Sequence, residues 1–296
     1  MDGLVFTPSA APHATRAPCA VHAALHGTPS VRPGAGGAAF GAVSGLVAAL
    51  VASQMAKPRS VRPRRVKHVC MAVPTEKPMR TTVFTKAALD GVSPGDCPFT
   101  HGVLMALKLK GVDYDVVACS PTTKPPWLLQ EVGGQMPCVV HQGVAHVESG
   151  KILKWIDQTF PGPTLAVPSD FEELVSRAGL FAAIAEYTKN TDSSKDADLL
   201  VTLQMALTRF RMHLFSLPIG TQYACGNALT LADCELLPAL YVLQNATAPL
   251  KGWSLNNLPE SDEIRQYYNR ASTLPAFAQT CYPPNVALQG WTAARS

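Results

Sequence analysis

The sequence predicts an α/β domain over residues 80–160, followed by an all-helical domain over residues 170–291. Two patterns support this division. Short strand-like runs alternate with helical patterns up to Phe160, and long helical patterns replace them after that point. Between the two domains, residues 161–169 contain three prolines, which disfavour a helix, and we interpret this segment as a linker.

The α/β domain is expected to follow the order βαβαββα. Its last two strands form a hairpin around Gln142 and Gly143, because these residues lie between two apolar runs and a glycine favours a tight turn. The strands are predicted at residues 82–85, 114–119, 138–141 and 144–147, and the helices at residues 98–110, 124–131 and 149–160.

The second domain is expected to contain long helices, predicted at residues 171–189, 197–217, 231–246 and 261–272. The third of these helices follows Thr230, and Asp233 lies three residues after that threonine. A hydroxyl at the N-cap and a carboxylate at the third helical position closely resemble a capping box. The sequence therefore predicts that this helix begins at Leu231.

The N-terminal segment, residues 1–71, has the composition of a transit peptide. It holds eight Lys or Arg residues against one acid, Asp2, and it is rich in Ala, Ser, Gly and Pro. Its apolar run, residues 41–53, starts late for a secretory signal and is too short to span a bilayer. Ser, Thr and Pro are abundant and no Arg-rich amphipathic helix opens the chain, so we predict import into the chloroplast stroma with cleavage near residues 70–72. The alternative is a disordered tail without a targeting role.

The remaining composition argues against several classes of partner. Residues 72–296 carry 17 basic and 20 acidic residues, so this part is mildly acidic and we expect no nucleic-acid partner. None of the eight cysteines forms a pair with CxxC spacing, which zinc ribbons and dithiol redox motifs require, and the eight histidines are scattered. We therefore predict no metal site and no bound cofactor.

One cysteine stands in a distinctive local sequence, Gly95-Asp-Cys-Pro-Phe-Thr100, between the first strand and the first helix. Pro98 suits the first helical turn, which puts Cys97 at the helix N-terminus, where free backbone N–H groups and the helix dipole favour a thiolate. Thr100 occupies the position where a dithiol motif has its second cysteine. A disulfide formed by Cys97 then needs an external thiol to resolve it. The alternative is a buried structural cysteine.

Two further motifs suggest a peptide-like ligand. Met136 and Pro137 open the third predicted strand, where a cis peptide bond would leave the Met136 backbone free to pair with a ligand. Glu148 and Ser149 precede a helix whose N–H groups and hydroxyl can hold a carboxylate. The plainer alternatives are an ordinary edge proline and a simple N-cap.

Taken together and in this order, these motifs resemble the glutathione transferases, and more narrowly the plant dehydroascorbate reductases. The resemblance spans about residues 80–291. It implies a thioredoxin-like N-terminal domain and an all-α C-terminal domain. Further matching segments are Lys86-Ala-Ala, Lys124-Pro-Pro-Trp127, Leu237-Pro-Ala-Leu-Tyr241, Lys251-Gly-Trp253 and Gly290-Trp291.

The resemblance also implies roles for individual residues. It makes Cys97 the redox nucleophile, with Lys86 and Asp96 at the site of the oxidised ascorbate. The glutathione-binding residues that it implies are Lys124, Met136, Pro137, Glu148 and Ser149. The chain departs from the family pattern in that Gln135 stands where a lysine is usual, Glu148 replaces an aspartate, and His101-Gly102 replaces a Gln-Arg pair.

The implied activity is glutathione-dependent reduction of dehydroascorbate, with glutathione as co-substrate, by a monomer that has no stable membrane association. An omega-class glutathione transferase is one alternative, against which Lys86 and Gly290-Trp291 argue. A protein similar to the chloride intracellular channels is another, but the apolar run 103–109 contains Lys108 and is too short for membrane insertion. An inactive interaction module would have no reason to keep an activated cysteine.

Overall fold

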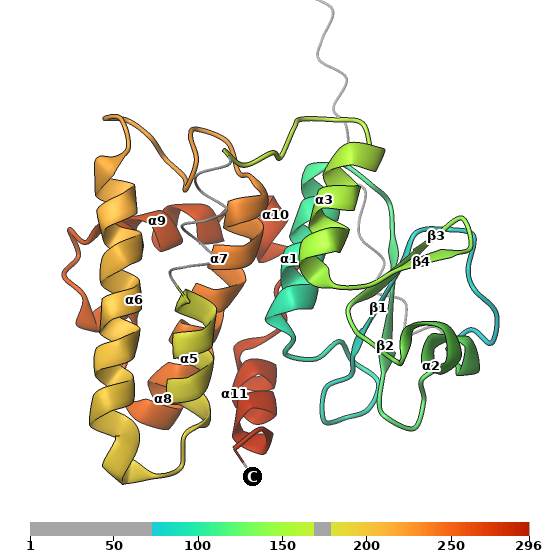
Figure 1. Cartoon of the computed structure of the whole chain (residues 1–296), viewed down its shortest axis with the longest axis horizontal. Coiled ribbons are helices and arrows are strands. Elements are labelled where there is room, and N and C mark those ends of the chain that lie inside the picture. Colours follow the sequence, from blue (N-terminus) through green and yellow to red (C-terminus); the bar gives the residue numbers. More distant parts are fainter. Residues whose placement is uncertain (1–72, 169–178, 296) are drawn as a thin grey trace, which may run out of the picture. The chain divides into compact units, whose positions relative to one another are not determined.

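The computed structural model describes residues 73–168 and 179–295, so the predicted transit peptide lies outside the described residues. The first elements form a four-stranded sheet of order β2-β1-β3-β4 (Figure 1). Strand β1 pairs parallel with β2 and antiparallel with β3, and β3 pairs antiparallel with β4. The strands are β1 (Thr82–Lys86), β2 (Asp115–Cys119), β3 (Cys138–His141) and β4 (Val144–His146).

Three helices accompany the sheet: α1 (Pro98–Leu109), α2 (Pro126–Val132) and α3 (Ser149–Thr159). Helices α1 and α3 agree with the predicted ranges to within one residue at each end. Helix α2 begins two residues later than predicted, because Pro125 restricts Lys124 to extended conformations and is itself extended before Pro126. Lys124 therefore lies in the loop before α2.

The alternation of side chains along the strands divides the sheet into two apolar faces. Val83, Val116 and Val139 belong to the large core that they share with α1 and α3. The next residues on the same strands face a smaller core with α2, which includes Trp127 packed edge-on against Phe84. The sheet thus has α1 and α3 on one face and α2 on the other (Figure 1).

The second domain is helical, as predicted, and its long helices are α5 (Leu180–Lys189), α6 (Asp196–Ser216), α7 (Leu231–Val242) and α9 (Glu263–Ser272). The predicted helix 171–189 is described only from residue 179 onward, and there α5 begins directly after Gly179. Helix α7 ends at Val242, and the predicted continuation to residue 246 is a π-helical turn, Leu243–Thr247. Short elements absent from the prediction are α8 (Ala248–Lys251), α10 (Pro275–Ala278), α11 (Pro284–Ala293) and the 3-10 turns Ser193–Lys195 and Leu255–Asn257.

The start of α7 confirms the predicted capping box. Thr230 and Asp233 exchange the expected side-chain to backbone hydrogen bonds, with the Thr230 N–H 2.7 Å from the carboxylate. The buried carboxylate also accepts hydrogen bonds from the Tyr267 hydroxyl at 2.8 Å and the Ala224 N–H at 3.1 Å. This cap fixes the first turn of α7 inside the helical domain.

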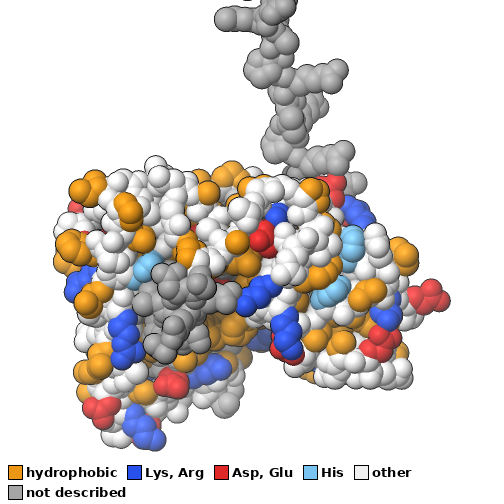
Figure 2. Space-filling view, turned by 45° about the horizontal axis from the view of Figure 1, so that its top comes forward, with side chains coloured by type: hydrophobic (Ala, Val, Ile, Leu, Met, Phe, Trp, Pro, Cys, Tyr) orange, Lys and Arg blue, Asp and Glu red, His pale blue; other side chains and the backbone are white. Residues whose placement is uncertain are grey.

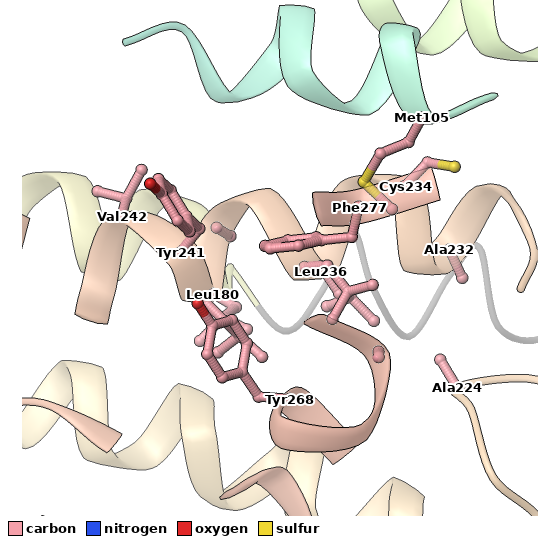
Figure 3. Packing of buried hydrophobic residues seen from close by; sticks show 14 of the residues in the cluster. Met105, Leu180, Ala224, Ala232, Cys234, Leu236, Tyr241, Val242, Tyr268 and Phe277 are labelled. Atoms are coloured by element: carbon pink, nitrogen blue, oxygen red, sulfur yellow. The ribbon is translucent and has the colours of Figure 1, made fainter. Parts of the chain in front are cut away.

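Helix α7 packs directly on α1, which joins the two domains through one core. Met105 of α1 points toward the helices of the second domain, where it meets residues such as Cys234 and Phe277 (Figure 3). The closest approach is at Gly102, where an added Cβ would lie 2.2 Å from the Cys234 carbonyl oxygen. The N-terminal half of α1, which begins beside Cys97, is therefore held between the sheet and α7.

The surface of the described part mixes both signs of charge. On the face shown in Figure 2, Lys and Arg side chains alternate with Asp and Glu side chains. Within residues 73–168 and 179–295, no helix combines the length and apolar character needed to cross a membrane.

Candidate active site

Cys97 is the N-cap of α1. Its backbone is extended, with φ −78° and ψ 110°, and Pro98 follows as the first helical residue. The Cys97 carbonyl accepts the first helical hydrogen bond, from the His101 N–H at 3.1 Å, and the side chain is half-buried. The thiol therefore lies at the positive end of the α1 dipole, next to N–H groups that the helix itself leaves unsatisfied.

An ion pair lies directly beside the cysteine. The Lys86 ammonium is 2.9 Å from Oδ1 of Asp96, with the lysine side chain 53% exposed and the aspartate side chain 8% exposed. The chain returns from β1 to Asp96 because the Gly95 N–H donates to the Lys86 carbonyl at 2.7 Å. The charged residues for which the family resemblance implies substrate binding are thus in contact with each other, and Asp96 is adjacent to Cys97 in the chain.

Asp96 is covered by the last helix of the chain. An added Cβ at Gly290 of α11 would lie 2.2 Å from Cγ of Asp96 and 2.3 Å from both carboxylate oxygens. Only a glycine permits this contact. The second domain therefore forms one wall of the site, and it buries the carboxylate that the first domain provides.

The register of the strands brings the remaining predicted segments to the same end of the sheet. The β1–β3 ladder ends at the pair Phe84 and Cys138, so the cis bond between Met136 and Pro137 lies just beyond it, toward Lys86. In the β3–β4 pair, Val139 lies opposite His146, which directs the chain after β4 back toward Pro137. This chain then reaches Glu148 and Ser149.

Two of the side chains predicted to bind glutathione already form contacts within the protein. Lys124 donates to the Gly134 carbonyl at 2.8 Å and so supports the loop that leads to Met136. Glu148 has a positive φ of 64°, rare for a residue with a side chain, and its carboxylate pairs with Lys151 at 2.8 Å. Ser149, half-buried, opens α3.

A cavity of about 650 Å³ opens next to these residues. Its walls include Pro98 and Phe99 at the start of α1, Glu148 and Ser149 at the start of α3, and apolar residues of α5 and α7. Cys97 itself is not among the lining residues. The cavity is large enough for a small organic molecule.

Burial makes four other thiols of the described part poor nucleophiles. Burial raises the pKa of the Cys138 thiol to about 12, and burial also raises the pKa values of Cys119, Cys234 and Cys281. Thr100, in the position of a resolving cysteine, has a buried hydroxyl 2.9 Å from that of Thr85. No group of three potential metal ligands occurs within residues 73–168 and 179–295.

His101, one of the departures from the family pattern, is buried one turn after Cys97. It is 1% exposed and packs among Tyr241, Phe277 and Tyr282, with ring centroids 4.8 to 5.9 Å away. Burial lowers the pKa of His101 to about 3. The backbone of Phe277 acts in the opposite direction but is the smaller effect, and neither ring nitrogen makes a well-formed hydrogen bond. The ring is therefore neutral at physiological pH.

This burial predicts a pH dependence of stability. The unfolded chain protonates His101 below its ordinary pKa of 6.5, whereas the folded protein takes up that proton only near pH 3, so stability decreases as the pH falls from 6.5 toward 3. Replacing His101 with Phe, which cannot be protonated, should reduce the loss of unfolding free energy between pH 7 and pH 5 by about 2 kcal/mol. Urea denaturation of both proteins at the two pH values measures this difference. Equal losses in the two proteins would contradict the assignment.

The sequence motifs pointed to the residues of the first domain but not to their partners in the second. Gly290 was noted only as part of a matching segment, and Tyr282 was not singled out. No helix was predicted over residues 284–293, so no sequence pattern indicated that Gly290 packs closely against Asp96. The contact of His101 with Tyr282 is a tertiary feature that no local pattern indicates.

Comparison with known proteins places this geometry in context. Residues 95–164 match the family described as glutathione S-transferase, N-terminal domain. The chain is 27% identical to Arabidopsis thaliana glutathione S-transferase DHAR2 over 199 residues, which cover 67% of this chain and 89% of the relative. It is also 27% identical to a rice protein named "Probable glutathione S-transferase DHAR2, chloroplastic", with 67% of this chain and 70% of the relative covered.

A solved structure agrees with these relatives. The crystal structure of Chlamydomonas reinhardtii dehydroascorbate reductase superimposes with a TM-score of 0.63 at 25% identity, covering 73% of this chain and 98% of that one. The chain therefore has the glutathione transferase fold, with a thioredoxin-like first domain and an all-α second domain, as the sequence predicted. Within this class it is similar to the plant-type dehydroascorbate reductases in both sequence and structure, which confirms the resemblance drawn from its motifs.

Proposed function

We propose that this protein reduces dehydroascorbate to ascorbate at the expense of glutathione, with Cys97 as the single redox nucleophile. The observation that carries the proposal is the half-buried Cys97 thiol at the α1 N-terminus, next to the Lys86–Asp96 ion pair. A thiolate is a good nucleophile toward an electron-poor polycarbonyl such as dehydroascorbate. The similarity to dehydroascorbate reductases supports the same reaction.

The proposed cycle has three balanced steps. In the first, the Cys97 thiolate, dehydroascorbate and one water give ascorbate and a Cys97 sulfenic acid, so the sulfur loses the two electrons that the substrate gains. In the second, a glutathione thiol attacks the sulfenic acid, releases water and leaves a mixed disulfide. In the third, a second glutathione attacks that disulfide, which regenerates Cys97 and releases glutathione disulfide.

The neighbouring residues have assigned roles in this cycle. Lys86, exposed beside Cys97, holds an anionic oxygen of the substrate, and Asp96 orients that lysine and the substrate. Glutathione lies along the Met136 backbone before Pro137, with its γ-glutamyl carboxylate at Ser149 and the N-terminus of α3, and Glu148 accepts from its ammonium. Lys124 supports the loop from Gly134 to Met136 and stands near the glycyl end of the tripeptide.

We also propose where the protein is located, what each part of the chain does and that it works as a monomer. Residues 1–71 act as a transit peptide for the chloroplast stroma, in line with their composition and with the name of the rice relative. Residues 80–160 form the glutathione-binding domain, 161–169 the linker and 170–291 the helical domain. The mature protein works as a monomer that uses glutathione and dehydroascorbate.

The test is a direct assay in which the purified protein is mixed with dehydroascorbate and glutathione. The formation of ascorbate is monitored by its absorbance. Turnover that needs both compounds supports the proposal. A parallel assay measures glutathione exchange with a small mixed-disulfide substrate. Activity in the second assay without the first would favour an omega-like transferase, and inactivity in both would favour a non-enzymatic role.

A further inference from the structure

The last helix of the chain lies directly on the carboxyl group of Asp96. An added Cβ at Gly290 would come within 2.3 Å of Cγ and of both carboxylate oxygens. The main chain of α11 therefore covers the whole carboxyl group and not one edge of it. Asp96 is 6% exposed, although it belongs to the loop that precedes α1.

This cover strengthens the ion pair between Asp96 and Lys86. The Lys86 ammonium donates to Oδ1 of Asp96 at 2.9 Å. Because α11 excludes water from the carboxylate, the attraction between the two charges is screened less than in an exposed pair. The lysine side chain is 53% exposed, and a long side chain at a surface otherwise samples many rotamers. The buried aspartate thus anchors an exposed lysine.

The anchored lysine keeps donors for another group. An ammonium has three N–H donors, and the described hydrogen bond to Asp96 uses one of them. The Gly95 N–H donates to the Lys86 carbonyl at 2.7 Å, so the end of β1 and the segment before Cys97 are also joined through their backbones. The position of the ammonium relative to Cys97 therefore depends on the orientation of the Asp96 side chain.

Helix α11 is itself fixed to the second domain. Trp291, the residue after Gly290, is 4% exposed, and its ring lies 6.4 Å from that of Phe181 in α5, edge to face. The Lys189 ammonium lies 5.5 Å from the centroid of the same tryptophan ring. A side chain added at Gly290 would thus meet a helix that is held from behind. The flexible Asp96 side chain would have to move instead.

We propose that Gly290 is a positioning residue for dehydroascorbate reduction, whose lack of a side chain lets α11 hold Asp96 in the orientation that presents the Lys86 ammonium to the substrate. The inference rests on the proposed function, because it needs an anionic substrate oxygen at Lys86. The second domain thereby contributes to the use of dehydroascorbate through Asp96. The segments proposed to bind glutathione all belong to the first domain.

The test is the substitution Gly290→Ala in the full-length chain, with kcat, both KM values and Tm measured alongside the wild type. We expect kcat/KM for dehydroascorbate to fall about tenfold, the loss typical of one hydrogen bond to a charged group. The KM for glutathione should stay unchanged. Alanine favours a helix over glycine, so α11 itself is retained. A merely structural glycine would lower Tm and leave kcat/KM for dehydroascorbate unchanged.

A double-mutant cycle tests whether Gly290 acts through Asp96. The substitution Asp96→Ala removes the carboxylate that the new side chain would displace, and it should itself lower kcat/KM for dehydroascorbate. Adding Gly290→Ala to this variant should then cause no further loss, because the added methyl group no longer meets a carboxyl group. A further loss in the double variant would overturn the inference.

Trp291→Phe provides the matched control in the same helix. It changes the packing of α11 on Phe181 but not the contact of Gly290 with Asp96, so Tm should fall and kcat/KM should stay unchanged. An equal loss of kcat/KM in this control would overturn the inference. If the wild type is active and Gly290→Ala keeps its full kcat/KM, the inference is overturned and the proposed function stands. If the wild type does not reduce dehydroascorbate, the proposed function is overturned, and the inference with it.

Discussion

Replacing Cys97 with serine is expected to abolish the reduction of dehydroascorbate, lowering kcat by at least about 10³-fold. The sulfur of Cys97 can give up two electrons and become a sulfenic acid, whereas the oxygen of a serine cannot. No other thiol can substitute for Cys97 among Cys119, Cys138, Cys234 and Cys281, since burial raises the pKa of each. The measurement is the glutathione-dependent increase in ascorbate absorbance.

The matched control for this variant is Cys225→Ser. Cys225 is half-buried like Cys97, but it lies in the helical domain before α7. We expect this protein to keep wild-type turnover. Mass spectrometry after incubation with glutathione disulfide should find a mixed disulfide on Cys97 in the control and none at that position in Cys97→Ser. Substantial activity in Cys97→Ser would show that another group is the nucleophile.

The first domain was predictable from its sequence because local signals agree with its tertiary structure. Short strand-like runs became strands, and Pro98 marked the start of α1. The hairpin turn at Gln142 and Gly143, both with positive φ, followed from the residue types. The start of α2 was wrong by two residues because the conformational limits set by two consecutive prolines outweighed the apolar pattern.

The second domain was less predictable at its C-terminal end. Helices α8, α10 and α11 each begin at or next to a proline, and α8 and α10 have only four residues each, too few for a periodic pattern. Their stability comes from packing against α1 and the other helices of the second domain. Sequence patterns do not reveal such contacts, so no helix was predicted over these residues.

In the candidate site, too, local features were predictable from the sequence and contacts between the domains were not. Position along the chain was enough to place Cys97 at a helix N-terminus and Glu148 before a helix. The burial of Asp96 under Gly290 and the packing of His101 against Tyr282 depend on how the two domains meet. These contacts decide how the reactive groups are solvated, and for that reason the electrostatics of the site required the structure.

A substitution at the contact between α1 and α7 is expected to have a large effect on stability. At Gly102 an added Cβ would lie 2.2 Å from the Cys234 carbonyl oxygen, a backbone atom of α7 that cannot rotate away. The substitution Gly102→Ala must therefore separate α1 from α7 and loosen the core around Met105. We expect it to lower the free energy of unfolding by about 3 kcal/mol, although alanine itself favours a helix by about 1 kcal/mol over glycine.

Urea denaturation followed by circular dichroism measures this change, and Gly150→Ala is the control. Gly150 lies in α3, where an added Cβ meets nothing within 4 Å, so alanine should leave the free energy of unfolding unchanged or raise it by up to about 1 kcal/mol. Two glycine substitutions in helices of the same domain thus have opposite expected signs, because only one of them faces the other domain. If Gly102→Ala were as stable as the control, α1 and α7 would not cross as closely as described. The packing of the second domain on Asp96 would then need to be revised as well.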